Sequence, residues 1–255
     1  MRYLILLLAL PVAAERITVP LRDPSRPATV RLSTVNGSIQ VRAHAAREVI
    51  VSTSDEGESP RPGPDGMKEI PLRQNGLRVE EENNVITVKP RSPNGSYVVY
   101  APANSSLQLK SVNARELRIE GIEGEINAET VNGSIQIAEA AGPVVAHALN
   151  GRLSVHMKDL AAGKPMSLST MNGRIELILP GSANADLTIH NQRGRTYSDF
   201  DLALTQRLTK KDSGREGGPR YELTLEQTAT GRLNGGGTAI SLRSMNGTIH
   251  IRKAQ

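Results

Sequence analysis

The chain has 255 residues, a net charge of +5 and no cysteine, so disulfides, thiolate nucleophiles and cysteine-ligated metals are excluded. Aromatic residues make up only 2% of the chain, and acidic residues are interspersed with the basic ones, so we expect no nucleic-acid partner. Plentiful glycine and the lack of a long helical period predict an all-β chain of short strands and turns.

The first predicted element is a secretory signal peptide, residues 1–14. Arg2 precedes the apolar run Leu4–Leu10, and Ala14 ends a short segment typical of a cleavage site. The run is too short for a hydrocarbon core of about 30 Å. No second apolar run follows, so we expect the mature chain, 15–255, to be soluble, without a transmembrane segment, and periplasmic or extracellular.

The mature chain is expected to form one domain, in which an octapeptide centred on Asn-Gly recurs. Full copies occur at 34–41, 130–137, 148–155, 170–177 and 244–251, with weaker ones at Asn113 and Asn191. Copies that follow one another at a period near 20 residues predict a repeat architecture. The asparagines are Asn36, Asn113, Asn132, Asn150, Asn172, Asn191 and Asn246, and the glycines of the corners are Gly37, Gly133, Gly151, Gly173 and Gly247.

Each copy alternates in polarity on both sides of its Asn, which we number position 0. Positions −6, −4, +3 and +5 are apolar or small, as in Val30, Leu32, Ile39 and Val41 of the first copy, and position −2 is small. Alternation with a period of two indicates two short strands joined at a corner. Gly at the corner is expected to supply a positive φ.

Two folds fit this pattern. In a single-stranded β-solenoid, similar to a parallel β-helix, each Asn-Gly is a corner and the stacked asparagines form an amide ladder about 4.8 Å apart. In an antiparallel meander or sandwich, each Asn-Gly closes a hairpin. Position −1 is always apolar and position +2 always polar in the full copies. This favours the solenoid, with position −1 turned into the core.

Two segments interrupt the repeats. Residues 54–66 are rich in Pro, Gly and acidic residues, and residues 209–219 are basic and rich in Gly, so both are expected to be mobile loops. Between them, Leu77–Glu80 and Val85–Val88 flank polar residues and predict a hairpin.

This combination resembles a bacterial family of extracytoplasmic β-strand-repeat proteins, the putative adhesins, whose function is otherwise unknown. The matching segments are 178–187, 197–202 and 235–249. The resemblance implies the solenoid fold and an adhesin-like role, and it implies no catalytic residue.

We find no motif of a metalloprotease, a nucleophile elbow, a phosphate-binding loop or a dinucleotide site. The histidines at 44, 147, 156, 190 and 250 occupy different repeat positions, so we expect no metal site and no cofactor. Two outward columns hold no concentration of acids: Gln40, Gln136, Ser154, Glu176 and His250 at +4, and Ser33, Glu129, His147, Ser169 and Arg243 at −3. Arg152, Arg174 and Glu176 are expected to form an ion pair between repeats.

The sequence therefore predicts an exported, non-enzymatic adhesin-like or scaffold module of the cell envelope. Its partner would be a surface polysaccharide, peptidoglycan or an envelope protein. Two alternatives stay open: a carbohydrate-active enzyme on a β-helix, and an envelope-stress or signalling component that binds a membrane protein.

Overall fold

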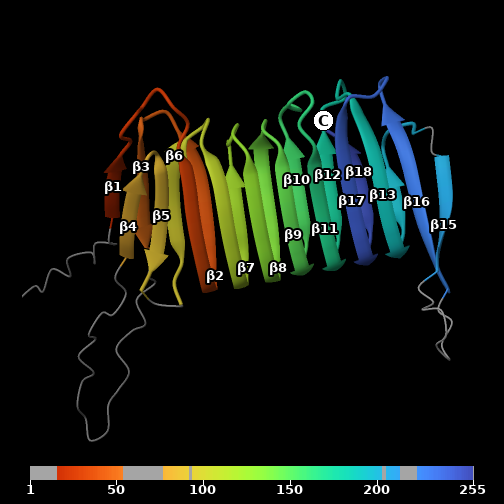
Figure 1. Ribbon diagram of the computed structural model, residues 1–255, viewed down its shortest axis with the longest axis horizontal. Helices are drawn as coiled ribbons and strands as arrows, with labels where there is room; N and C mark the ends of the chain where they lie inside the picture. Colours follow the sequence, from red (N-terminus) through yellow and green to blue (C-terminus); the bar gives the residue numbers. More distant parts are fainter. Residues whose placement is uncertain (1–15, 54–76, 92–93, 203–204, 213–222, 255) are drawn as a thin grey trace, which may run out of the picture.

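A computed structural model describes residues 16–53, 77–91, 94–202, 205–212 and 223–254. Within these residues the chain forms eighteen strands and no helix, so the all-β class is confirmed (Figure 1). None of the described segments has the helical length and apolarity needed to cross a bilayer. The expected signal peptide, 1–14, and the expected loop at 54–66 lie outside the described residues.

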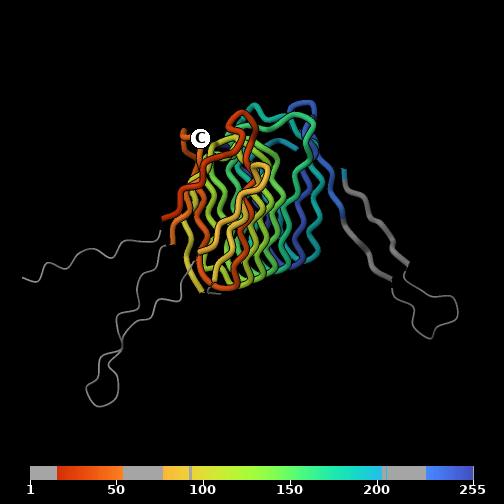
Figure 2. The backbone as a smooth tube through the Cα atoms, turned by 60° about the vertical axis from the view of Figure 1, so that its left-hand side comes forward, coloured from red at the N-terminus to blue at the C-terminus, as the bar shows by residue number. Residues whose placement is uncertain are grey.

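Most Asn-Gly copies pair with one another in parallel. Strands on the two sides of a corner bond to neighbouring repeats: β9 pairs with β8 and β11, and β10 pairs with β8 and β12. The strands of these copies are β2 (Thr29–His44), β7 (Ser106–Glu120), β8 (Ile126–Ala140), β9 (Val144–Asn150), β10 (Leu153–Met157), β11 (Met166–Asn172), β12 (Ile175–Leu179), β17 (Thr238–Asn246) and β18 (Ile249–Lys253). Figure 2 brings the N-terminal end forward and shows the repeats stacked behind it.

The spatial order of the repeats differs from their order in the chain at both ends. β2 lies between β7 and the pair formed by β5 (Val85–Pro90) and β6 (Tyr97–Pro102). β17 and β18 lie between the β11–β12 repeat and the repeat formed by β13 (Ala185–Arg193) and β14 (Thr196–Ser198). The first and last copies are therefore each inserted one place inside an end of the stack.

Antiparallel strands cover the two ends. β4 (Leu77–Glu82) pairs with β5, β3 (Glu48–Thr53) with β6, and β1 (Arg16–Pro20) with β3. At the other end β16 (Leu223–Leu233) pairs with β13, and β15 (Thr205–Asp212) with β16. Such strands occupy the free edges that a stack of parallel strands leaves open.

Two of the predictions from the sequence concern these end strands. The predicted hairpin is confirmed as β4 and β5, which turn through Asn83 and Asn84 at positive φ. The predicted loop at 209–219 is wrong over its first four residues, because Thr209–Asp212 pair with β16 as part of β15. The rest of that loop lies outside the described residues.

The core is one continuous apolar cluster between two layers of strands, one formed by the segments before the corners and one by the segments after them. Val30 and Leu32 before the corner, and Ile39 and Val41 after it, are all at most 1% exposed. Burying such a side chain contributes about 1.5–3 kcal/mol. Aliphatic side chains, repeated in register, therefore fill a core that has almost no aromatic residues.

Candidate binding surface along the asparagine edge

The corner asparagines lie side by side along one edge of the stack, which we call the asparagine edge. Each side-chain amide donates from Nδ2 to the Oδ1 of its neighbour on the N-terminal side of the stack. The bonds run Asn36 to Asn94 (2.6 Å), Asn113 to Asn36 (2.9 Å), Asn132 to Asn113 (2.8 Å), Asn150 to Asn132 (3.0 Å), Asn172 to Asn150 (2.8 Å) and Asn246 to Asn172 (2.9 Å). All the amides point the same way, so the row is straight and continuous.

Asn94 begins this row, although no Asn-Gly copy was predicted there from the sequence. Leu32 pairs beside Val88, and Asn36 pairs beside Asn94. Two more residues separate Val88 from Asn94 than separate Leu32 from Asn36. Because of this insertion, the apolar residues before Asn94 do not stand at the spacing of the other copies. After the corner the spacing is regular, since Tyr97 pairs beside Ile39.

Asn191 does not belong to the row, so the sequence assignment was wrong by two residues. Arg193 pairs with Asn246, and Asn191 pairs with Ser244 at the inward position −2. The Asn191 amide donates to the backbone oxygen of Gly247 at 3.3 Å. Ile189 is buried and shares the phase of Asn191, so the alternation in this strand already indicated the inward register.

The glycines after the corners are needed mainly because backbones approach closely. Gly37 and Gly133 do have positive φ values of 116° and 133°. Gly151, Gly173 and Gly247 are not among the glycines with a positive φ. The expectation that a positive φ requires glycine at the corner was therefore wrong for these three. A Cβ on Gly151 would overlap the carbonyl oxygen of Gly133. The missing side chain therefore lets one corner stack directly on the next.

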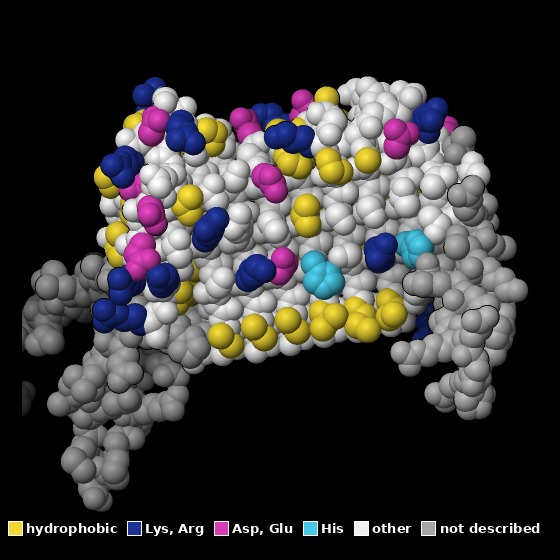
Figure 3. Space-filling view, viewed as in Figure 1, with side chains coloured by type: hydrophobic (Ala, Val, Ile, Leu, Met, Phe, Trp, Pro, Cys, Tyr) yellow, Lys and Arg dark blue, Asp and Glu magenta, His cyan; other side chains and the backbone are white. Residues whose placement is uncertain are grey.

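The apolar side chains at position −1 point outward, contrary to the expectation that they enter the core. The strand stays extended up to the Asn, so position −1 keeps the outward phase of positions −3 and −5. We call these side chains the apolar row. It comprises Val35 (45% exposed), Val112 (42%), Val131 (38%), Met171 (39%), Met245 (38%) and the partly exposed Leu149. Figure 3 shows this row along the lower margin of the molecule.

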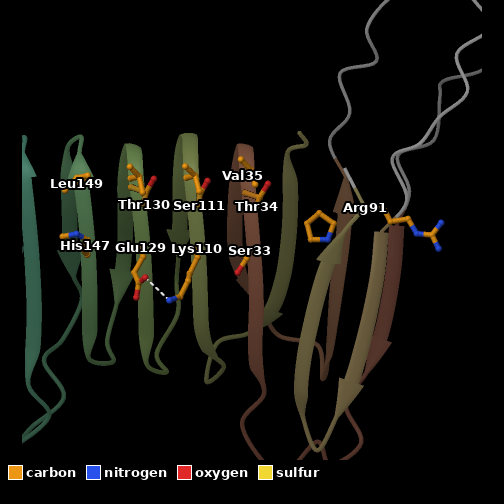
Figure 4. A pocket seen from close by; sticks show the side chains of 13 residues that line it. Ser33, Thr34, Val35, Arg91, Lys110, Ser111, Glu129, Thr130, His147 and Leu149 are labelled. Atoms are coloured by element: carbon orange, nitrogen blue, oxygen red, sulfur yellow. Dashed lines mark ion pairs between the residues drawn. The ribbon is translucent and has the colours of Figure 1, made fainter. Parts of the chain in front are cut away.

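A groove of about 730 Å³ runs beside the row over β2, β7, β8 and β9. Its lining includes Val35, Val112, Val131 and Leu149 from the apolar row, and polar side chains from position −3. Among the latter, Lys110 Nζ lies 3.0 Å from Glu129 Oε2 (Figure 4). The surface thus offers an apolar stripe beside a polar one, which suits an extended chain that lies across the strands with its apolar side chains on the row.

The other residues considered for chemistry lie apart from this groove. Glu176 is paired, but with Arg252 at 3.1 Å and not with Arg152 or Arg174 as expected. The pKa of His250 is lowered, first by burial and then by the positive charges of Arg174 and Arg252. Within the described ranges, no three His, Asp or Glu side chains gather closely enough to hold a metal ion.

No family model and no curated protein matches the chain. Among solved structures, it is similar to a putative cell adhesion protein from Clostridium sporogenes, at 10% identity and a TM-score of 0.42 over 95% of this chain and 100% of that one. It is also similar to a putative adhesin from Bacteroides fragilis, at 10% identity and a TM-score of 0.40 over 95% of this chain and 97% of that one. No functional inference follows from likenesses at this level.

Proposed function

We propose that the chain is an exported, non-enzymatic, adhesin-like interaction module of the cell envelope, built as a β-solenoid. The parallel register between Asn-Gly copies supports the solenoid. We propose that its binding surface is the apolar row with the adjoining groove, and that the occupant is an extended, apolar segment of an envelope protein.

The apolar row carries this proposal. Six apolar side chains from six neighbouring strands stay outward in register. With strands about 4.8 Å apart the row is about 24 Å long, the length of roughly seven residues of extended chain. A contiguous apolar stripe bordered by polar residues is typical of a protein-interaction site.

The carboxylates in the two outward columns support a non-enzymatic role over a glycan-cleaving one. Glycoside hydrolysis needs two carboxyl groups that serve as acid and as base or nucleophile. Glu129 and Glu176, which lie in the two columns inspected for acids, are each held by a cation, at 3.0 Å and 3.1 Å. Each is thereby engaged in a contact between neighbouring repeats.

The binding test uses mature protein, 15–255, immobilised and exposed separately to envelope proteins, peptidoglycan and surface polysaccharide. Val131→Asp with Leu149→Asp places two charges in the row, and we expect retention of envelope protein to fall about tenfold. Val145→Asp is the matched control, because Val145 is 40% exposed on β9 but lies outside the row. Equal loss in the control, or retention that the row variant leaves unchanged, would contradict the proposal.

Export has its own test. Mass spectrometry of the protein from the periplasm or the medium should find an N-terminus at Glu15. Intact Met1 on protein recovered from the cytoplasm would show that residues 1–14 are not removed as a signal.

A further inference from the structure

Three arginines line up on the layer opposite the apolar row, each two residues after a corner. They are Arg152, Arg174 and Arg195. Leu153 N donates to Arg174 O at 2.9 Å, and Ile249 N donates to Arg195 O at 3.0 Å, with Thr248 between these two arginines. Strands about 4.8 Å apart place the three side chains along a line of about 14 Å.

These arginines have no acidic partner within the part of the chain that the structure describes. None of the three takes part in a side-chain hydrogen bond or an ion pair there. By contrast, Arg42, Arg232 and Arg252 each lie within 3.8 Å of a carboxylate. Glu176, the acid nearest in register, is occupied by Arg252, so the surface keeps an excess of positive charge.

The electrostatic environment of His250 agrees with that excess. After burial, the largest causes of its lowered pKa are Arg174 and Arg252, and these precede the opposing effects of Glu176 and Asp199. His250 pairs beside Glu176 on β12 and beside Tyr197 on β14. The arginines therefore dominate the charge that faces this imidazole.

An exposed aromatic ring borders the arginines. Tyr197 on β14 is 47% exposed. It follows Arg195, the residue directly before β14, by two positions, so both side chains leave the same face of the chain. Its ring centroid lies 5.0 Å from that of His250. A flat ring beside cationic groups can pack against the apolar face of a sugar while the guanidinium groups bind its acidic substituents.

We propose that Arg152, Arg174, Arg195 and Tyr197 form a binding site for a linear acidic polysaccharide. Guanidinium groups bind carboxylate or sulfate oxygens in pairs, and their spacing by one and two strands suits acidic groups that recur along an extended glycan. Single-stranded nucleic acid is disfavoured because it needs several stacking rings. This site lies on the other layer and does not rest on the function proposed for the apolar row.

The test measures binding of polygalacturonate to the mature protein by calorimetry at low salt. Arg174→Gln with Arg195→Gln should weaken binding about tenfold or more, since each change removes a charge-assisted hydrogen bond. Arg31→Gln with Arg243→Gln removes the same charge from the opposite layer and should change affinity less than about twofold. Circular dichroism checks that these exposed substitutions leave both variants folded.

Two further arms separate the possible ligands. Neutral dextran should not bind, and a single-stranded DNA oligonucleotide should bind more weakly than polygalacturonate. Bound polyanion should raise the pKa of His250 in an NMR titration, because negative charge favours the imidazolium. Absence of polygalacturonate binding, equal loss in both double variants, or tighter binding of DNA would overturn the proposal. The two proposals are tested separately: Val131→Asp with Leu149→Asp should reduce retention of envelope protein and leave the binding of polygalacturonate unchanged.

Discussion

The two edges of the stack constrain the chain to different degrees. At the asparagine edge, the full Asn-Gly copies turn with the same residue types in the same register. Their amides are bonded to one another and to Asn113, whose repeat has Ala114 in place of the glycine and one extra residue before Leu117. At the opposite edge, which we call the return edge, the connections are 121–125, 141–143, 158–165 and 180–184. Their lengths range from three to eight residues, and they share no sequence.

This difference explains how an uneven period forms an even stack. The step from one Asn to the next varies, at 19, 18 and 22 residues for Asn113 to Asn172. The return edge takes up most of the variation, since the step of 22 residues contains the longest connection, 158–165, and one extra residue after Asn113 accounts for the difference between 19 and 18. The amide bonds hold the asparagines of neighbouring repeats in register. A change at the asparagine edge should therefore cost more stability than a comparable change at the return edge.

The largest difference is expected between glycines of the two edges. Gly151→Ala should lower the free energy of unfolding by about 3 kcal/mol, because its Cβ would meet the backbone oxygen of Gly133 and the corner must shift. Gly163→Ala, at a φ of 73° in open space on the return edge, should cost about 1 kcal/mol from backbone strain alone. Denaturant unfolding of both variants measures the difference. Equal costs would show that the corners do not stack as closely as the structure has them.

A smaller difference is expected between asparagines of the two edges. Asn132→Ala removes one donor and one acceptor from the row and should cost about 1 kcal/mol, since water can reach the exposed amides left behind. Asn104 is exposed in the connection from β6 to β7, which also lies on the return edge, and Asn104→Ala should change stability by less than about 0.5 kcal/mol. Thermal unfolding compares the two, and an indistinguishable pair of midpoints would remove the amide row as a source of stability.

The row also bears on the first copy, which residues 54–66 separate from the later copies in the sequence. If Asn36 lay apart from the main array for that reason, Asn36→Ala would cost less than Asn150→Ala. Asn36 is instead bonded to Asn94 on one side and Asn113 on the other, as Asn150 is to Asn132 and Asn172. We therefore expect the two substitutions to lower the unfolding midpoint about equally, and a clearly smaller effect of Asn36→Ala would show that its repeat is loosely stacked.

The sequence could predict what each repeat does by itself. Polarity with a period of two marks Leu32 and Ile39 as buried, because inward and outward positions alternate locally along an extended strand. It could not predict which repeats become neighbours. β2 and β17 are inserted one place from the ends through contacts that no local pattern encodes. The prediction that the apolar row enters the core is wrong for a different reason: its residues are apolar, but their phase along the strand is outward.

The smallest effect is expected at the end of the amide row. There Arg193 pairs beside Asn246, at the position where another Asn would continue the row. Each Oδ1 in the row accepts from the amide on its C-terminal side, so an amide at position 193 would face Asn246 Oδ1. Arg193→Asn should then stabilise the fold by about 0.5–1 kcal/mol, the net gain of one hydrogen bond, and should raise the unfolding midpoint by a few degrees. Gln192→Asn is the control, because residue 192 lies between Asn191 and Arg193, which pair beside Ser244 and Asn246, and so is outside the row. If the corner of this repeat were at Asn191, as the sequence indicated, Arg193→Asn would gain no partner, and its midpoint would match that of the control.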